Sequence, residues 1–227
     1  MENENVNYYA GKLNSSKLYQ VYDTDIPRVK QYLDAEINFF CGQLNGTERI
    51  LEVGSGYGRI LKVLAPYAKS LTGIDISKET IDFGREYLKD LSNVTLSVMD
   101  AYKLEFEDKF DVALCLQNGL SAIKGEPYDL VMKCVKALTK GGKGYFSTYS
   151  EKFWKHRLAW FEEQANKGLL GEIDKKLTKD GVIVCKDGFR AITFTEEDLI
   201  RLGQMSGCPH KIQEVDESSL FLIITKP

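Results

Sequence analysis

The sequence of 227 residues has few of the features that mark several common classes of protein. It contains five cysteines, at positions 41, 115, 134, 185 and 208, and no Cys-x-x-Cys pair. Their odd number and scatter argue against a disulfide framework and against a zinc site, so we expect reduced thiols and no metal. With 30 Lys+Arg against 33 Asp+Glu, the formal charge of -3 provides no global field for nucleic acid or an anionic membrane.

The chain also has no long apolar run. Residues 1–5 are acidic and polar, no apolar segment follows them, and no stretch approaches the length of a membrane span. We therefore expect a soluble, cytoplasmic protein without a targeting sequence. The sequence has no internal repeat and no low-complexity segment, and its length fits one α/β core domain with an appendage.

A glycine-rich loop follows the first apolar, β-branched segment. The run Ile50-Leu51-Glu52-Val53 leads into Gly54-x-Gly56-x-Gly58, after which apolar residues recur at helical spacing. This order predicts a strand, a tight turn and a helix. Glycines allow positive φ and close approach of a ligand to the main chain, and the following helix offers free N–H groups.

Strand and helix signals alternate from this loop to residue 150, which implies a parallel sheet with helices on both faces. A helix is predicted after Ser77. Another is predicted from the helical spacing of Leu130, Val131, Cys134, Val135 and Leu138, and Gly141-Gly142 should end it. After a helix that starts near Thr195, two further strands are expected. The predicted strands are 49–53, 71–76, 94–99, 110–116, 145–149, 210–215 and 219–225.

Two segments do not fit this alternation. Residues 1–48 contain several tyrosines and a helical pattern after Pro27, so we expect a helical N-terminal lid. Residues 151–194 begin with an aromatic-rich helix and contain two Asp-Gly turns, at 180–181 and 187–188. These turns predict a substrate-side insertion with a three-stranded antiparallel meander (173–177, 182–185 and 189–194). The core is then 49–150 and 195–227.

Polar residues interrupt the apolar strands where parallel strands end, which is where ligands bind in open α/β sheets. Asp75, Asp100 and Gln117-Asn118 should therefore meet the glycine loop. The loop lacks the Gly-x-Gly-x-x-Gly spacing of a dinucleotide site, and Glu52 lies two residues before it. A buried acid at this point favours a cationic ligand over a diphosphate.

These residues together resemble class I S-adenosylmethionine-dependent methyltransferases. The resemblance is carried by Glu52-x-Gly54-x-Gly56-x-Gly58, by Asp75 in Gly73-Ile74-Asp75-Ile76, by Asp100-Ala101 and by Phe110-Asp111-Val112. It covers residues 48–150 closely, and residues 195–225 fit the closing hairpin of the family. The resemblance implies a Rossmann-like sheet of seven strands, mostly parallel with an antiparallel last strand.

The resemblance also implies that S-adenosyl-L-methionine is the cofactor. Glu52 would support the loop near the cationic amine, Asp75 would bind the ribose hydroxyls, and Asp100 would accept from the adenine amino group. Ala101 and Gln117 would contact the adenine ring and the amino-acid end. Asp100 could instead be a plain cap. The implied cofactor residues are Glu52, Gly54, Ser55, Gly56, Tyr57, Asp75, Ile76, Asp100, Ala101, Gln117, Tyr9 and Tyr22.

Substrate-side candidates come from the segments that overhang the strand ends. Tyr9, Tyr19 and Tyr22 could contact the sulfonium or the cofactor carboxylate, or could only pack within the lid. Other candidates have equally plain alternatives: His156 could be a surface residue, and Lys152, Lys155 and Arg157 could form a solvated helix face rather than an anion site. The substrate-side candidates are Tyr22, Asn118, Ser121, Tyr149, His156 and Arg190.

Methyl transfer needs alignment and dehydration more than a strong base, so no obligatory catalytic residue is expected. Residues 116–119 lack the motif of base-amino methyltransferases, and Cys115 lacks the preceding proline of the cytosine type, so nucleic acid is an unlikely substrate. We expect methyl transfer to N or O of a small molecule. The alternatives are a non-catalytic S-adenosylmethionine or S-adenosylhomocysteine binding module and a nucleotide-dependent oxidoreductase. The sequence does not indicate an oligomeric state.

Overall fold

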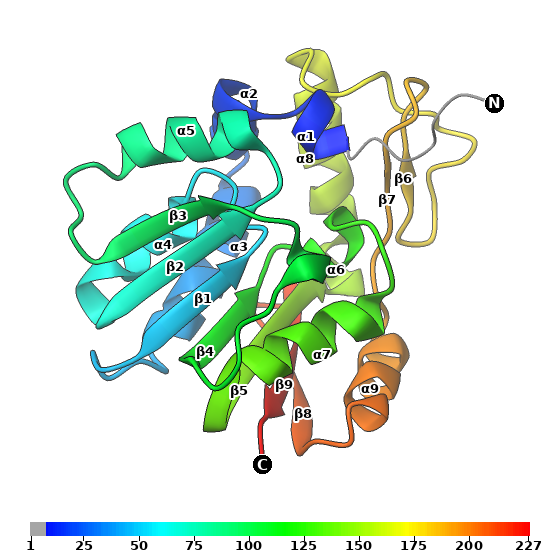
Figure 1. Cartoon of the computed structure of the whole chain (residues 1–227). Helices are drawn as coiled ribbons and strands as arrows, with labels where there is room; N and C mark the ends of the chain where they lie inside the picture. Colours follow the sequence, from blue (N-terminus) through cyan, green and yellow to red (C-terminus); the bar gives the residue numbers. More distant parts are fainter. Residues whose placement is uncertain (1–7) are drawn as a thin grey trace.

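The computed structural model describes residues 8–227 as a seven-stranded sheet between two layers of helices, with a separate two-stranded sheet (Figure 1). The strands are β1 Arg49–Val53, β2 Ser70–Asp75, β3 Val94–Val98, β4 Phe110–Cys115, β5 Leu138–Tyr149, β6 Ile183–Val184, β7 Arg190–Ala191, β8 His210–Val215 and β9 Ser219–Thr225. The large sheet has the order β3-β2-β1-β4-β5-β9-β8. Neighbours from β3 to β5 are parallel, whereas β9 is antiparallel to β5 and β8. This confirms the predicted mostly parallel sheet with an antiparallel last strand.

Two of the helices begin at side-chain caps that the sequence predicts. Ser77 accepts a hydrogen bond from the Thr80 amide, and Thr195 forms a capping box with Asp198. The helices are α1 Tyr8–Gly11, α2 Ser15–Tyr22, α3 Pro27–Cys41, α4 Arg59–Leu64, α5 Lys78–Tyr87, α6 Gly119–Ala122, α7 Pro127–Ala137, α8 Trp154–Asn166 and α9 Glu196–Met205, with short 3₁₀ helices η1 Ala65–Tyr67, η2 Ala101–Lys103 and η3 Glu151–Phe153. Between residues 8 and 227, no helix combines the length and the apolar character that crossing a bilayer requires.

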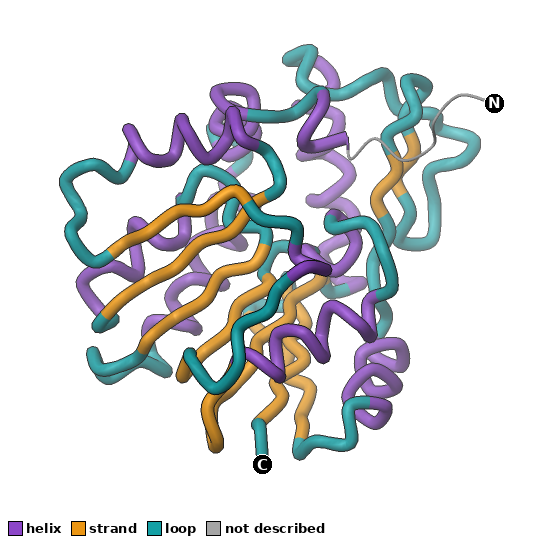
Figure 2. Tube along the Cα trace, in the orientation of Figure 1, coloured by secondary structure: helices purple, strands orange, loops and turns teal. Residues whose placement is uncertain are grey.

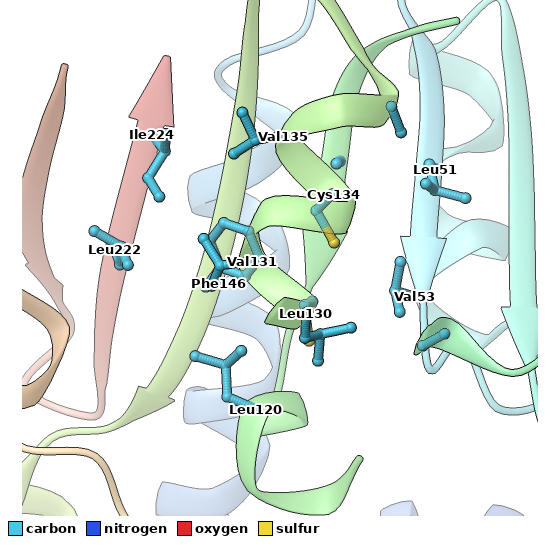
Figure 3. Close-up of a cluster of buried hydrophobic side chains, with 14 of the residues drawn as sticks. Leu51, Val53, Leu120, Leu130, Val131, Cys134, Val135, Phe146, Leu222 and Ile224 are labelled. Atoms are coloured by element: carbon cyan, nitrogen blue, oxygen red, sulfur yellow. The ribbon is translucent and has the colours of Figure 1, made fainter. Parts of the chain in front are cut away.

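Two apolar clusters cover the two faces of the sheet. On one face, α7 presents Leu130, Val131 and Cys134 at helical spacing toward β1, β5 and β9 (Figure 3). On the other face, α3 and α4 contribute Ile37 and Leu61 to a second cluster. Because both faces are buried, the central strands are apolar on both sides, as parallel strands require.

A third apolar cluster joins the N-terminal segment to the insertion. Tyr32 of α3 packs against Phe153 with ring centroids 4.9 Å apart, and Trp160 and Phe161 of α8 belong to the same cluster. This cluster lies beyond the carboxyl ends of the parallel strands, where α1, α2 and α8 are seen together (Figure 1). The two segments outside the alternating core therefore pack on each other at the ligand end of the sheet.

The sequence-based boundary between α7 and β5 is wrong. The helix ends at Ala137, and β5 starts at Leu138 rather than at residue 145. Gly141 and Gly142 do not end the helix but lie within β5, where the register with β4 shifts and Gly141 has φ +77°. The left-handed residue absorbs this irregularity, so the glycine pair marks a bulge rather than a helix end.

The three-stranded meander is also wrong, since the small sheet has two strands, β6 and β7. In the segment 173–177, only Ile173 pairs, in a single bridge with Cys185. The Asp174 carboxylate accepts hydrogen bonds from the backbone N–H groups of Lys176 and Leu177 and bends the chain away. Most of residues 167–182 is accordingly loop (Figure 2).

Substitution Gly58→Ala is expected to destabilise the protein by roughly 1 to 3 kcal/mol because of overpacking. Gly58 has φ +84°, and an added Cβ would lie 2.5 Å from Cδ1 of the buried Leu88. Gly46→Ala is the matched control, since Gly46 has φ +92° with nothing within 4 Å of the added atom. Denaturant unfolding measures both variants. Equal losses would contradict the packing explanation and leave only backbone strain.

Candidate functional site

A cavity of about 320 Å³ lies at the carboxyl ends of β1, β2 and β4, between the glycine loop, α2 and α8. The arrowheads of these strands point toward α1, α2 and α8 in Figure 1. The structure brings together at this cavity the predicted cofactor residues Glu52, Gly54, Ser55, Gly56, Tyr57, Asp75, Ile76, Asp100, Ala101, Gln117 and Tyr22. Tyr9 is in α1, but its side chain lies outside the part of the chain that the structure describes.

The glycine loop has the backbone that its sequence predicts. Gly54, Gly56 and Gly58 all have positive φ. A Cβ on Gly56 would lie 2.9 Å from the Cδ2 atom of Leu18 in α2, so the lid helix contacts the loop directly. The N–H groups of Gly54 and Ser55 both donate to the Ile74 carbonyl at 2.9 Å, which fixes the loop to the end of β2. Glycine is required here both for conformation and for close approach.

Asp75 ends β2 and faces the loop. Its Oδ2 accepts from the Gly56 N–H at 3.1 Å, and its Oδ1 accepts from the Ser77 N–H at 2.9 Å. Burial raises the pKa of the Asp75 carboxyl, and the amide donors counteract this. Each carboxylate oxygen retains a lone pair after these bonds, so the group can still accept from a ligand in the cavity.

Asp100 has the capping role that the sequence left open, and its role toward adenine stays a prediction. It lines the cavity, and its Oδ1 also accepts from the Tyr102 N–H at 3.0 Å as the cap of η2. Ala101 and Tyr102 follow it along the cavity wall. Its capping bond therefore holds the carboxylate in place at the rim.

Glu52 and Arg59 both line the cavity, and each has a buried polar atom without a hydrogen-bond partner in the described chain. Glu52 is 3% exposed, and its Oε2 has no hydrogen-bond partner among residues 8–227. The same holds for Nη2 of Arg59, whose guanidinium lies 4.4 Å from the ring centroid of Tyr22. Burial raises the pKa of Glu52 to about 8; Arg59 opposes this shift, whereas Glu36 and Asp75 add to it. Arg59 was not singled out from sequence, although its position directly after the third glycine could have indicated it.

A second buried acid was also missed. Glu36 of α3 is buried, and its Oε1 accepts from the hydroxyl of Ser147 on β5, which in turn accepts from the Gln117 N–H at 2.7 Å. Burial raises the pKa of Glu36. Gln117 has φ +52°, and its Nε2 makes no hydrogen bond within the described residues. The chain from Glu36 through Ser147 thus sets the backbone that turns Gln117 toward the cavity.

The N-terminal segment is held over the cavity at several points. The Tyr8 hydroxyl donates to Oδ2 of Asp187 in the insertion at 2.7 Å, and Lys12 Nζ donates to the Asp187 carbonyl at 3.2 Å. The indole N–H of Trp160 donates to the Val21 carbonyl at 3.0 Å. Residues 8–22 and the insertion are therefore fastened to each other as well as to the core.

Some substrate-side candidates do not face the cavity. Asn118 and Ser121 are buried and are not among the cavity-lining residues. The Asn118 amide donates to the Ile192 carbonyl at 2.8 Å, and the Ser121 hydroxyl accepts from the Ile192 N–H at 3.1 Å. Their polar groups fix the chain leaving the insertion, which explains why they are absent from the cavity wall. Tyr22 and Tyr149 do line the cavity.

Three further candidates lie at the surface. His156 and Arg190 are exposed and do not line the cavity, so the surface alternative for His156 is the one the structure supports. Tyr19 is 45% exposed and packs on the outer side of Tyr57, with ring centroids 5.6 Å apart. Tyr22, three residues later in α2, lines the cavity, whereas Tyr19 does not.

Arg157 does not belong to the solvated basic face that the sequence suggested for Lys152, Lys155 and Arg157. Lys152 and Lys155 are exposed, but Arg157 is only 1% exposed. Its guanidinium donates to the Gly181 carbonyl at 2.7 Å and lies 4.5 Å from the ring centroid of Tyr149. The insertion folds over this side of α8 and buries Arg157. The sequence of α8 alone does not predict this burial.

Comparison with known proteins gives consistent results. A family model described as "Methyltransferase domain" matches residues 50–142. The chain is 26% identical over 117 residues to a ubiquinone biosynthesis O-methyltransferase of Proteus mirabilis, with 50% of this chain and 45% of that protein aligned. The chain thus spans a little under half the length of the curated relatives it matches.

Solved structures extend the likeness to almost the whole chain. The PH0226 protein from Pyrococcus horikoshii superposes with a TM-score of 0.70 at 22% identity and covers 93% of this chain and 99% of its own. The N-methyltransferase NodS from Bradyrhizobium japonicum, in complex with S-adenosylhomocysteine, gives 0.58 at 17% identity and 95% coverage of each chain. At these identities the likeness concerns the fold.

Proposed function

Because residues 50–142 belong to the methyltransferase-domain family and the chain has the class I S-adenosylmethionine-dependent methyltransferase fold, we propose that it methylates N or O of a small molecule. S-adenosyl-L-methionine is the proposed cofactor. Its adenine lies by Asp100 and Ala101, its ribose hydroxyls donate to Asp75, and its amino-acid end lies between Glu52 and Arg59. These placements follow the cavity lining and rest on no bound ligand.

The observation that carries the proposal is a pair of buried polar groups in the cavity wall that lack partners. Buried polar groups are normally hydrogen-bonded, yet Glu52 Oε2 and Arg59 Nη2 have no hydrogen-bond partner in the described chain. An α-amino acid offers an ammonium to the first and a carboxylate to the second. A dinucleotide offers neither, which disfavours the oxidoreductase alternative.

When bound, the sulfonium would supply an electrophilic methyl group. The S–C electron pair would stay on sulfur, the acceptor lone pair would form the new bond, and the acceptor's proton would be lost to bulk water when the product leaves. The chain's own residues align the two reactants and exclude solvent. Glu52 and Arg59 fix the amino-acid end, Asp75 fixes the ribose, and α2 covers the glycine loop. No residue is assigned as a general base, because methyl transfer from a sulfonium does not require a strong base.

Two measurements test this function. S-adenosylmethionine should raise the melting temperature of the protein, and NAD should not. A screen with labelled methyl donor against pools of amines, carboxylates and phenols should then yield labelled product. Binding of the donor without product from any pool would favour the non-catalytic binding module, and no binding would refute both.

A further inference from the structure

One side of the cavity is built entirely from segments outside the cofactor-binding loops. Every cavity-lining residue that α2, α8 and β5 contribute is uncharged. The charged lining residues are Glu52, Arg59, Asp75, Asp100 and Lys124, and none of them belongs to α2, α8 or β5. The cavity therefore has a charged side that matches the cofactor and a neutral side whose ligand is still to be assigned.

The neutral side is mainly aromatic. Tyr22 and Trp160 have ring centroids 6.3 Å apart, Trp160 and Phe161 lie 6.1 Å apart in T-shaped contact, and Tyr149 completes the wall from β5. The hydrogen bond from Trp160 to the Val21 carbonyl fixes the indole in place. Rings held from three elements form a preformed surface for a flat apolar ligand.

Gln164 places a side-chain amide on this side of the cavity. It is 3% exposed and lines the cavity. It follows Trp160 by four residues, so the two side chains share one face of α8. An amide both donates and accepts hydrogen bonds, so it can bind the hydroxyl or ring nitrogen of a ligand in the cavity.

The surroundings of these rings disfavour a cationic acceptor. Arg59 already lies 4.4 Å from the Tyr22 ring centroid, and Arg157 lies 4.5 Å from that of Tyr149 and 5.4 Å from that of Phe161. A second cation over the same rings would be repelled by these guanidinium groups. A carboxylate or phosphate would lose its hydration and would have to share Arg59 with the amino-acid end of the cofactor.

We propose that this neutral side, the acceptor pocket (Tyr22, Tyr149, Trp160, Phe161 and Gln164), binds a small, uncharged aromatic or heteroaromatic methyl acceptor. Gln164 orients the acceptor through a hydrogen bond to its hydroxyl or ring nitrogen. This inference rests on the proposed methyltransferase function. The cavity is near the lower end of the size range of ligand pockets, which limits the acceptor to a compact molecule.

The test uses the 227-residue protein saturated with S-adenosylhomocysteine, whose binding is measured first by calorimetry. Ligand-observed NMR then compares catechol and indole with ethanolamine and acetate. Catechol and indole should bind and the other two should not. Gln164→Leu should weaken catechol binding roughly three- to tenfold, the range for losing one neutral hydrogen bond, while S-adenosylhomocysteine affinity stays unchanged. Gln204→Leu, at an exposed position of α9, is the matched control.

The outcomes separate this proposal from the function it rests on. If S-adenosylhomocysteine binds but catechol and indole do not, or if ethanolamine or acetate binds more tightly, the aromatic acceptor is refuted and the cofactor site stands. If Gln164→Leu leaves catechol affinity unchanged, or weakens S-adenosylhomocysteine equally, the orienting role of Gln164 is refuted. If S-adenosylhomocysteine does not bind, the proposed function itself fails.

Discussion

Asp75→Ala is expected to weaken binding of S-adenosylhomocysteine by roughly ten- to a hundredfold, the equivalent of one or two charge-assisted hydrogen bonds. The carboxylate lies at the end of β2 on the cavity wall, where it can accept from two vicinal hydroxyls. Its bonds to the Gly56 and Ser77 N–H groups orient it for this purpose. Calorimetry on the purified variant gives the change in Kd directly.

Two controls distinguish a lost ligand contact from a disturbed loop. Asp75→Asn keeps one acceptor oxygen and should lose less affinity than the alanine variant. 5′-Methylthioadenosine has the ribose but no amino-acid part, so its affinity should fall in parallel with that of S-adenosylhomocysteine. An unchanged Kd in Asp75→Ala would rule out the ribose assignment.

S-Adenosylhomocysteine is expected to bind more tightly as the pH rises from 6 to 8, by up to about tenfold per pH unit below the pKa of Glu52. Burial raises that pKa to about 8 in the free protein, with Arg59 opposing and the acids Glu36 and Asp75 reinforcing the shift. The ligand's ammonium requires the ionised carboxylate, so binding below pH 8 releases a proton. Glu52→Gln should flatten this dependence and weaken binding at pH 8.

A second ligand, 5′-methylthioadenosine, makes this test specific to the amino-acid end. Neither Glu52→Gln nor Arg59→Met should change the affinity for 5′-methylthioadenosine, because that ligand lacks both the ammonium and the carboxylate. A pH dependence that persists in Glu52→Gln, or an equal loss of both ligands, would show that Glu52 does not bind the amino-acid end.

The raised pKa of Glu52 affects the stability of the free protein in the opposite direction: stability falls as the pH rises, whereas ligand binding strengthens. A carboxyl with a raised folded-state pKa binds its proton more tightly in the native than in the unfolded state. The stability that it contributes is therefore complete below pH 4.5, its ordinary pKa, and is lost as the pH rises toward 8. Ligand binding offsets this loss over the same pH range.

Much of the core could be predicted because its signals are local. The strands at 49–53, 210–215 and 219–225 agree with the sequence-based boundaries, since each apolar run is bounded by polar or turn residues. The glycine loop, Asp75 and Asp100 meet at one cavity because parallel strands end at one edge of a sheet. Topology, rather than sequence proximity, brings these residues together.

The remainder depended on contacts between distant segments. Arg157 appeared to lie on a polar face until the insertion covered it, and Glu36 gave no sign of its bond to Ser147, 111 positions away. Gln164 follows an ordinary helical pattern, and only the packing of α8 against α2 turns its amide toward the cavity. Such residues are identified by three-dimensional burial rather than by motif.

The fastening of residues 8–22 to Asp187 and Trp160 has a kinetic consequence. Because Leu18 lies against Gly56, we expect exchange of a spent nucleoside at this end to require α2 to move away and these bonds to break. We then expect this opening to limit the steady-state rate, as in other enzymes with closing segments. Rapid-quench mixing would accordingly show a burst of one methylated product per active site, followed by slower turnovers set by departure of the product.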